Sequence, residues 1–263
     1  MVGRTFPVSP LDFDGLTQSL SAIRTQAQAS GTYFGTSTVF GYDLVFATSG
    51  LYSVYKVTAL ADPPNGCTNT SNQPGWGTWS VGVETLFATG TIPTHGVMFF
   101  EDHLWVRGAV NGKRVTVGSG RFPDNPSTRT SITVNEDLRY TNYDGTDSIG
   151  LVAQNNFNVG LMSDDYLRID GALAAQNGRV GRFYYQAPSE QSQAEKCAPW
   201  AVRQEIALYG MILSNQRYGF GYSDLTGYIV RNLIYDTNFL YGPPPNFPLL
   251  GTNFQIVSWE EVQ

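Results

Sequence analysis

The sequence predicts an all-β protein, a parallel β-solenoid of the β-helix kind with a capping α-helix at its N-terminal end. The main observation is an internal repeat. Residues 167–178 read LRIDGALAAQNG, residues 206–215 repeat nearly all of this segment, residues 104–110 repeat its first half and residues 149–156 its second half. A full copy holds an aliphatic run, a glycine, a second aliphatic run and a polar corner with asparagine. Such copies indicate units that stack and bury one continuous core.

The spacing of the corner asparagines supports this fold class. Asn155 and Asn177 are 22 residues apart, and treating part of the polar stretch 186–204 as an inserted loop brings Asn177 and Asn215 to a similar interval. Repeats of this length are typical of solenoids. We expect the asparagines to stack at one corner and five aliphatic residues to point inward: Leu151, Ile169, Leu173, Leu208 and Ile212. An antiparallel sandwich of similar strands is the alternative.

Composition sets the remaining bounds. The chain has 263 residues, of which 14% are charged, and a formal net charge of −6, which disfavours general attraction to nucleic acid or anionic lipid. There is no apolar run long enough to span a membrane, and no signal peptide is visible. We expect one domain over residues 1–263, as part of a longer protein.

The N-terminal helix is predicted over residues 11–31. Asp14 is a suitable N-cap and Gly31 a suitable C-terminal stop. The apolar stripe consists of Leu16, Leu20, Ile23 and Ala27. A solenoid has an open first coil that something must cover, so we expect this helix to cap it. A partner-binding helix is the alternative.

Short strands follow the helix. Residues 39–46 and 51–57 alternate around a Thr-Ser-Gly turn and predict a hairpin. Further strands are expected at 97–100, 104–106, 115–117, 132–134 and 138–140, followed by the repeats. Residues 254–259 predict one last strand.

Two inserted loops, 62–78 and 186–204, each contain one cysteine, Cys67 and Cys197. A pair of this kind is compatible with one disulfide between the loops, and two free thiols are the alternative. The cysteines share no metal-binding spacing with the two histidines, so no metal and no cofactor are expected.

A β-helix polysaccharide lyase or glycosidase is the main enzyme alternative, because such enzymes need carboxylates that converge on one face. The candidate carboxylates are Asp144, Asp147, Asp164, Asp165 and Asp170. Several lie at predicted corners, where Asp is favoured by turn chemistry alone. We therefore predict that the chain is not an enzyme and assign no catalytic residue.

A locally basic stretch, 179–231, contains arginines interleaved with tyrosines. Arginines bind phosphates and aromatic rings stack on bases, so the stretch could form a weak DNA surface. The candidate residues are Arg179, Arg182, Arg203, Arg217, Tyr184 and Tyr185. The alternative is that these arginines pair with nearby carboxylates while the tyrosines pack the end of the fold.

Several segments together carry a family resemblance: GTYFG at 31–35, DHLWVRG at 102–108, GLVAQN at 150–155, MILSNQR at 211–217, and the end with Tyr-Asp, Pro-Pro-Pro and Ser-Trp-Glu. The chain resembles the bacterial PilX-like, pilus-associated proteins, a family that includes a large minor pilin of natural competence. The resemblance implies an extracellular β-solenoid ectodomain at the cell surface, held to other pilins through an N-terminal segment outside this sequence. It also implies DNA reception at a type IV pilus, with a surface adhesin or display module as the alternative.

Overall fold

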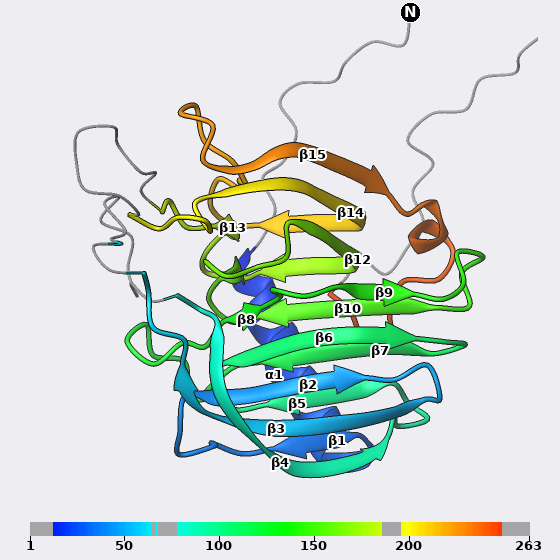
Figure 1. Ribbon diagram of the computed structural model, residues 1–263. Helices are drawn as coiled ribbons and strands as arrows, with labels where there is room; N and C mark the ends of the chain where they lie inside the picture. Colours follow the sequence, from blue (N-terminus) through cyan, green and yellow to red (C-terminus); the bar gives the residue numbers. More distant parts are fainter. Residues whose placement is uncertain (1–12, 65–66, 68–77, 186–195, 249–263) are drawn as a thin grey trace, which may run out of the picture.

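The computed structural model describes residues 13–64, 67, 78–185 and 196–248 (Figure 1). Most of the described chain is β-structure, preceded by one helix, α1 (Phe13–Ser30). The strands are β1 (Thr32–Phe34), β2 (Gly41–Phe46), β3 (Leu51–Leu60), β4 (Val81–Thr91), β5 (Val97–Phe100), β6 (Leu104–Val110), β7 (Arg114–Ser119), β8 (Ile132–Thr133), β9 (Leu138–Tyr140), β10 (Ser148–Ala153), β11 (Phe157–Val159), β12 (Tyr166–Ala175), β13 (Val180–Arg182), β14 (Val202–Ser214) and β15 (Gly227–Tyr235). A 3₁₀ helix, η1 (Thr237–Leu240), follows. Among the described residues, no helix is both long and apolar enough to cross a bilayer.

The strands form a large, mostly parallel sheet (Figure 1). One ladder runs β1-β5-β7-β10-β12-β14 and another β2-β6-β9-β12-β14-β15, while β8, β11 and β13 form a shorter one. Within the described chain, antiparallel pairing of named strands is confined to the hairpins β2–β3 and β3–β4. The first of these hairpins confirms the prediction at 39–57.

The predicted repeat sets the register of the longest ladder. Leu151 lies beside Leu173, and Leu173 beside Ile212. The expected inward residues Leu151, Ile169, Leu173 and Leu208 share one core, and Ile212 is partly buried against it. That part of the core prediction is confirmed.

The corner prediction needs one correction. Since Ala153 pairs with Ala175, Asn155 and Asn177 follow at equivalent positions, and the side-chain amide of Asn177 donates to Gln154 O at 2.7 Å. Asn215 instead aligns with Gln176, whose carbonyl accepts from the Asn215 amide at 3.0 Å. The asparagine of the third copy thus lies one residue earlier in the corner.

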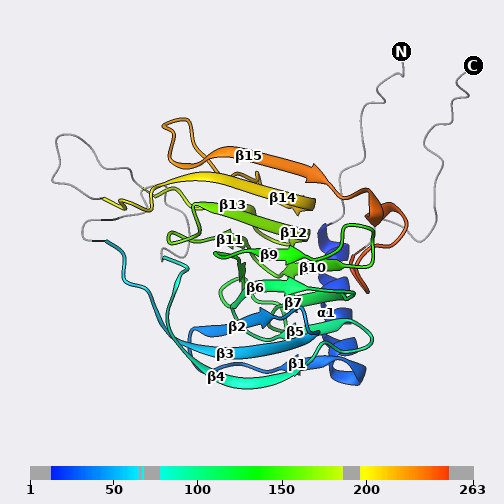
Figure 2. The same cartoon turned by 45° about the vertical axis from the view of Figure 1, so that its right-hand side comes forward.

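Helix α1 lies against a face of the sheet rather than over the end of the ladders, which corrects the expected terminal cap (Figure 2). Leu20, Ile23 and Ala27 are buried. They pack in one cluster with outward residues of β5, β10 and β12, namely Val97, Phe99, Val152, Ala172 and Ala174. Those strands carry apolar side chains on both faces of the sheet. The outer face therefore has to be shielded from solvent, and α1 shields it instead of the end of the ladders.

The two ends of the sheet differ. At one end, the β3–β4 hairpin adds to β2, and Phe87 of β4 contacts Phe34, whose ring stacks on Phe100 at 5.0 Å. At the other end, β15 pairs with β14 on one side, and no described strand pairs with its outer edge. Ile229–Tyr235 is exposed throughout, and Ile234 is 57% exposed. The strand predicted at 254–259 lies outside the described residues.

Cys67 and Cys197 form a disulfide across 130 positions of sequence. The sequence left this pairing and two free thiols open. The bond lies in a small apolar cluster with Leu161, Phe183 and Ala201. It joins the segment between β3 and β4 to the segment between β13 and β14, and much of both inserted loops lies outside the described residues.

Candidate functional site: an acidic pocket beside strand β4

The site begins with a charge inside an apolar strand. In β2, Tyr42, Leu44 and Phe46 point into the core, so Asp43 lies on the opposite, outer face. The parallel neighbour β6 places Trp105 beside Asp43 and Arg107 beside Val45. Asp43 and Arg107 therefore lie on the same face of adjacent strands, two positions apart.

Strand β4 closes over this face. Its ladder with β3 contains three register shifts, and such irregularities bend a strand. Figure 1 shows the first part of β4 rising across β3 and β2 toward the level of β6. This path brings Glu84 of β4 to Arg107, whose Nη2 donates to Glu84 Oε1 at 2.9 Å.

Arg107 is shared by three carboxylates. Its Nε donates to Asp43 Oδ2 at 2.9 Å, and its Nη1 donates to Glu136 Oε2 at 3.3 Å, in addition to the bond to Glu84. Fully ionised, the group would carry two negative charges in excess, within a partly buried site. We call these four residues, Asp43, Glu84, Arg107 and Glu136, the acidic cluster.

Two carboxylate oxygens of the acidic cluster, Asp43 Oδ1 and Glu84 Oε2, are buried and have no hydrogen-bond donor among the described residues. Asp43 is 1% exposed. Burial is the largest cause that raises the pKa of Asp43 from 3.8 to about 7; Arg107 opposes the rise, and a hydrogen bond to Glu84 adds to it. Two acceptors in contact need a proton between them. Near pH 7, Asp43 is therefore about half protonated, and below that it is mostly neutral.

The acidic cluster borders a cavity of about 350 Å³. The other lining residues are Ser80, Val81, Gly82, Trp105, Val106, Asn135 and Met162. The cavity thus combines carboxylates with an apolar wall. No grouping of three or more His, Cys, Asp or Glu suited to a metal ion occurs within the described ranges. Chemically, this arrangement can hold a proton or accept hydrogen bonds from a cation.

Three of the six residues predicted for a DNA surface are buried. Arg182 is fully buried, and its guanidinium donates to the carbonyls of Gly160, Leu161 and Trp200. Tyr185 is 1% exposed. Arg203 is 5% exposed and pairs with Asp165 at 2.7 Å. These side chains hold strand ends and loops together and cannot reach a phosphate backbone.

The other three DNA candidates are at least partly exposed. Arg179 donates to Arg182 O at 2.7 Å and lies over the Phe183 ring. The Tyr184 hydroxyl donates to Asp224 at 2.8 Å. Of the six candidates, only Arg217 is largely exposed, and it lies at the open β14–β15 end.

The carboxylates considered for a lyase or glycosidase do not converge. Asp170 is buried and accepts from Arg168, from the Tyr140 N–H and from the Tyr143 hydroxyl. Asp147 is also buried and accepts from three backbone N–H groups. Asp165 pairs with Arg203, and Asp144 closes a turn onto Thr146. The two buried carboxylates, Asp147 and Asp170, therefore hold backbone N–H groups of neighbouring turns and strands in place.

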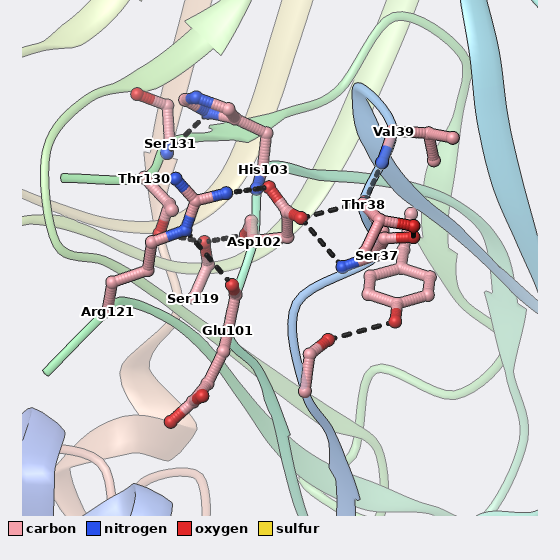
Figure 3. Close-up of polar contacts among 12 residues, drawn as sticks. Ser37, Thr38, Val39, Glu101, Asp102, His103, Ser119, Arg121, Thr130 and Ser131 are labelled. Carbon is pink, nitrogen blue, oxygen red and sulfur yellow. Dashed lines mark hydrogen bonds and ion pairs between the residues drawn. The ribbon is translucent and has the colours of Figure 1, made fainter. Parts of the chain in front are cut away.

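Asp102 is the centre of a further buried polar cluster, which Figure 3 shows. Asp102 accepts from the Ser37 N–H at 2.9 Å, the Ser37 hydroxyl at 2.7 Å and Arg121 at 2.6 Å. His103 Nδ1 accepts from the Ser131 N–H at 3.1 Å, and burial lowers the pKa of His103 to about 4. A neutral imidazole whose ring nitrogen accepts from backbone is poorly suited to activate a nucleophile, so this cluster joins neighbouring turns.

The acidic cluster could not be recognised in the sequence, because its four members come from four separate segments. A signal existed nonetheless. Asp43 is the one charge in the strand GYDLVF, and a carboxylate on the outer face of a strand that is otherwise buried requires a partner.

No family model, no curated protein and no solved structure matches this chain. The resemblance to PilX-like proteins consequently stays a prediction.

Proposed function

We propose that this chain is a β-solenoid ectodomain of a pilus-associated, minor-pilin-like protein, and that it works outside the cytoplasm as a binding and display module. The solenoid part is supported by three parallel ladders whose strands come from successive parts of the chain. The sequence repeats fall in register on the longest ladder. Stacked units of this kind tolerate long insertions, because each unit rests on its neighbours.

The disulfide is the observation that carries the proposed location. Cys67 and Cys197 come from segments far apart in sequence, and their bond ties two inserted segments together. Disulfides persist in oxidising compartments and are rare in reducing cytosol. The bond thus supports an exported protein.

Within this proposal, display or adhesion is better supported than DNA reception, which is the narrower function. Three of the six DNA candidates are buried, and the chain as a whole carries a net charge of −6. A DNA surface requires accessible cations that pair with phosphates. Of the candidates, Arg217 is the exposed arginine that could serve.

The experiment is to locate a tagged copy of the chain in its own bacterium. We expect the tag in sheared surface filaments, with both cysteines oxidised on a non-reducing gel. A cytosolic protein with two free thiols would contradict the proposal. Gel-shift titration with duplex DNA tests the narrower form: salt-sensitive binding that Arg217→Ala weakens would favour it.

A further inference from the structure

The open end of the parallel ladders carries an inference that does not depend on the display function. No described strand pairs with the outer edge of β15, and its residues 229–235 are exposed on both faces. An exposed apolar strand edge is a template for another strand, and native proteins cover such edges. The large apolar side chains exposed here are Ile229, Val230, Leu233, Ile234 and Tyr235.

A groove of about 790 Å³ lies beside this edge. Leu208 and Ile212 of β14 line it together with Leu233 of β15, and Tyr218 also borders it. Leu208 belongs to the main core, and Ile212 packs against that core. Because Leu233 pairs with Leu208, both side chains point to the same side of the sheet. The groove is therefore the place where the main core reaches solvent at the β15 end of the described chain, and we call it the end groove.

We propose that residues 254–259 of the same chain, Phe-Gln-Ile-Val-Ser-Trp, add to the edge of β15 as an antiparallel strand and cover the end groove. Aromatic and β-branched residues of this kind favour a strand. Phe254 and Ile256 fall on one face of such a strand, which can cover the groove. Val257 and Trp259 fall on the other, so the two apolar faces match the two exposed faces of β15.

The described chain ends close enough to β15 for this segment to reach it. The ring of Phe247 packs on Gly150 of β10, and the ladder continues from β10 through β12 and β14 to β15. A strand added beyond β15 lies four strand spacings from β10, about 19 Å at ~4.8 Å each. The connection from Pro248 to Phe254 spans roughly 20 Å when it is extended. The connection is therefore just long enough.

The position of Phe247 also sets the direction of the added strand. In the ladder, Gly150 lies level with Met211 of β14. Met211 directly follows the residue that pairs with Tyr235, the last residue of β15. The chain therefore arrives at the C-terminal end of β15, where an antiparallel strand can begin. A parallel strand would have to begin near Gly227, roughly 26 Å further along β15, which the connection cannot reach.

The charges beside the end groove fit the same direction. Arg217 lines the groove, and Arg217 and Arg231 line an adjoining cavity of about 390 Å³. Arg231 donates to backbone carbonyls, and no described carboxylate pairs with either arginine. Glu260 and Glu261 directly follow the proposed strand. An antiparallel strand that begins at Tyr235 brings these glutamates to the stretch of β15 that contains Arg231. The glutamates and a DNA backbone would therefore compete for Arg217.

The test is hydrogen exchange of the whole chain, read by mass spectrometry on peptides that cover β15 and residues 254–259, with molar mass measured by light scattering. Ile256→Pro removes a backbone donor from the middle of the proposed strand and prevents its pairing there. Val262→Pro is the matched control, because Val262 lies beyond that strand. Exchange of β12 shows in each variant whether the stack stays folded.

We expect residues 254–259 and β15 to exchange at least roughly tenfold more slowly in the parent than in Ile256→Pro, with β12 unchanged. Val262→Pro should behave like the parent. Replacing both Glu260 and Glu261 by arginine should speed exchange of the same peptides by roughly two- to fivefold, and adding Arg217→Glu should restore part of the protection.

The added strand has two competitors for the end groove, a second copy of the chain and a separate partner. Protection that appears only as the chain dimerises would assign the groove to the second copy and overturn the intrachain strand. Exchange of residues 254–259 in the parent as fast as in an unfolded peptide would leave the groove to a separate partner and would also overturn it. Exchange of β15 that Ile256→Pro leaves unchanged would do the same.

Discussion

Replacing Asp43 by asparagine should remove a pH-dependent part of the stability of this protein. The folded-state pKa of Asp43 is raised from 3.8 to about 7, mainly by burial. Between these two values the native state binds a proton that the unfolded state has lost. The free energy of unfolding should therefore fall as pH rises, which is opposite to the usual behaviour of a paired aspartate.

The magnitude follows from the width of that window. Each pH unit between the two pKa values changes the free energy of unfolding by about 1.4 kcal/mol, so the loss from pH 4 to pH 7 is on the order of 4 kcal/mol. Full contribution is present below pH 4, and the profile should become flat above pH 7. The asparagine side chain of the Asp43→Asn variant does not titrate, so the variant lacks this slope.

The assay is urea unfolding of the parent and of Asp43→Asn at half-unit steps from pH 4.5 to pH 8. Subtracting the two free energies cancels the other titrating groups, including Asp164, whose pKa is also raised by burial. The difference should fall steadily with pH up to about pH 7. A flat line for Asp43→Asn would show that Asp43 is ionised throughout this range and would refute its raised pKa.

Three further perturbations test the fold. Leu173→Ala should lower the free energy of unfolding by roughly 2–5 kcal/mol, because Leu173 is fully buried in the main core; chemical denaturation measures this, and a loss below about 1 kcal/mol would contradict the register of β10 and β12. Arg182→Met should cost several kcal/mol in the same assay, since three carbonyls lose a charged donor, and a stable variant would show that the arginine is dispensable. Removing the disulfide with Cys67→Ser and Cys197→Ser should cost about 2–5 kcal/mol, seen as a lower thermal midpoint that reductant no longer changes.

Much of the fold could be predicted because the repeat and the core reflect the same constraint. Strands β10 and β12 are almost entirely buried, β14 buries alternate residues along its middle, and the aliphatic runs of the three strands recur at matching positions. A glycine in each long copy, Gly171 and Gly210, has φ +155° and lies where the backbone of the preceding strand in the ladder approaches closely. The repeat thus located three strands that pair in one parallel ladder.

The sequence predicted that α1 is a helix, but it did not predict which surface of the sheet the helix covers. An apolar stripe indicates only that one side of a helix packs against other parts of the protein. Whether the covering surface is the end of a sheet or its face depends on the outward residues of other strands. Val97, Phe99 and Val152 decide it, and their exposure could not be read from their own segments, because a strand buried on both faces shows no alternation.

The misplaced DNA surface and the unexpected acidic pocket have one physical origin. In a chain with 14% charged residues, a charge is as available for internal structure as for the surface. Arg182 follows Val180 and Gly181 in a short buried strand, and its long side chain bonds loop carbonyls that no strand satisfies. Arg107 likewise donates to three carboxylates, and two of their buried oxygens have no hydrogen-bond partner among the described residues. The number of charges in a segment therefore did not locate a binding surface, because the sequence does not show which charges become buried and paired on folding.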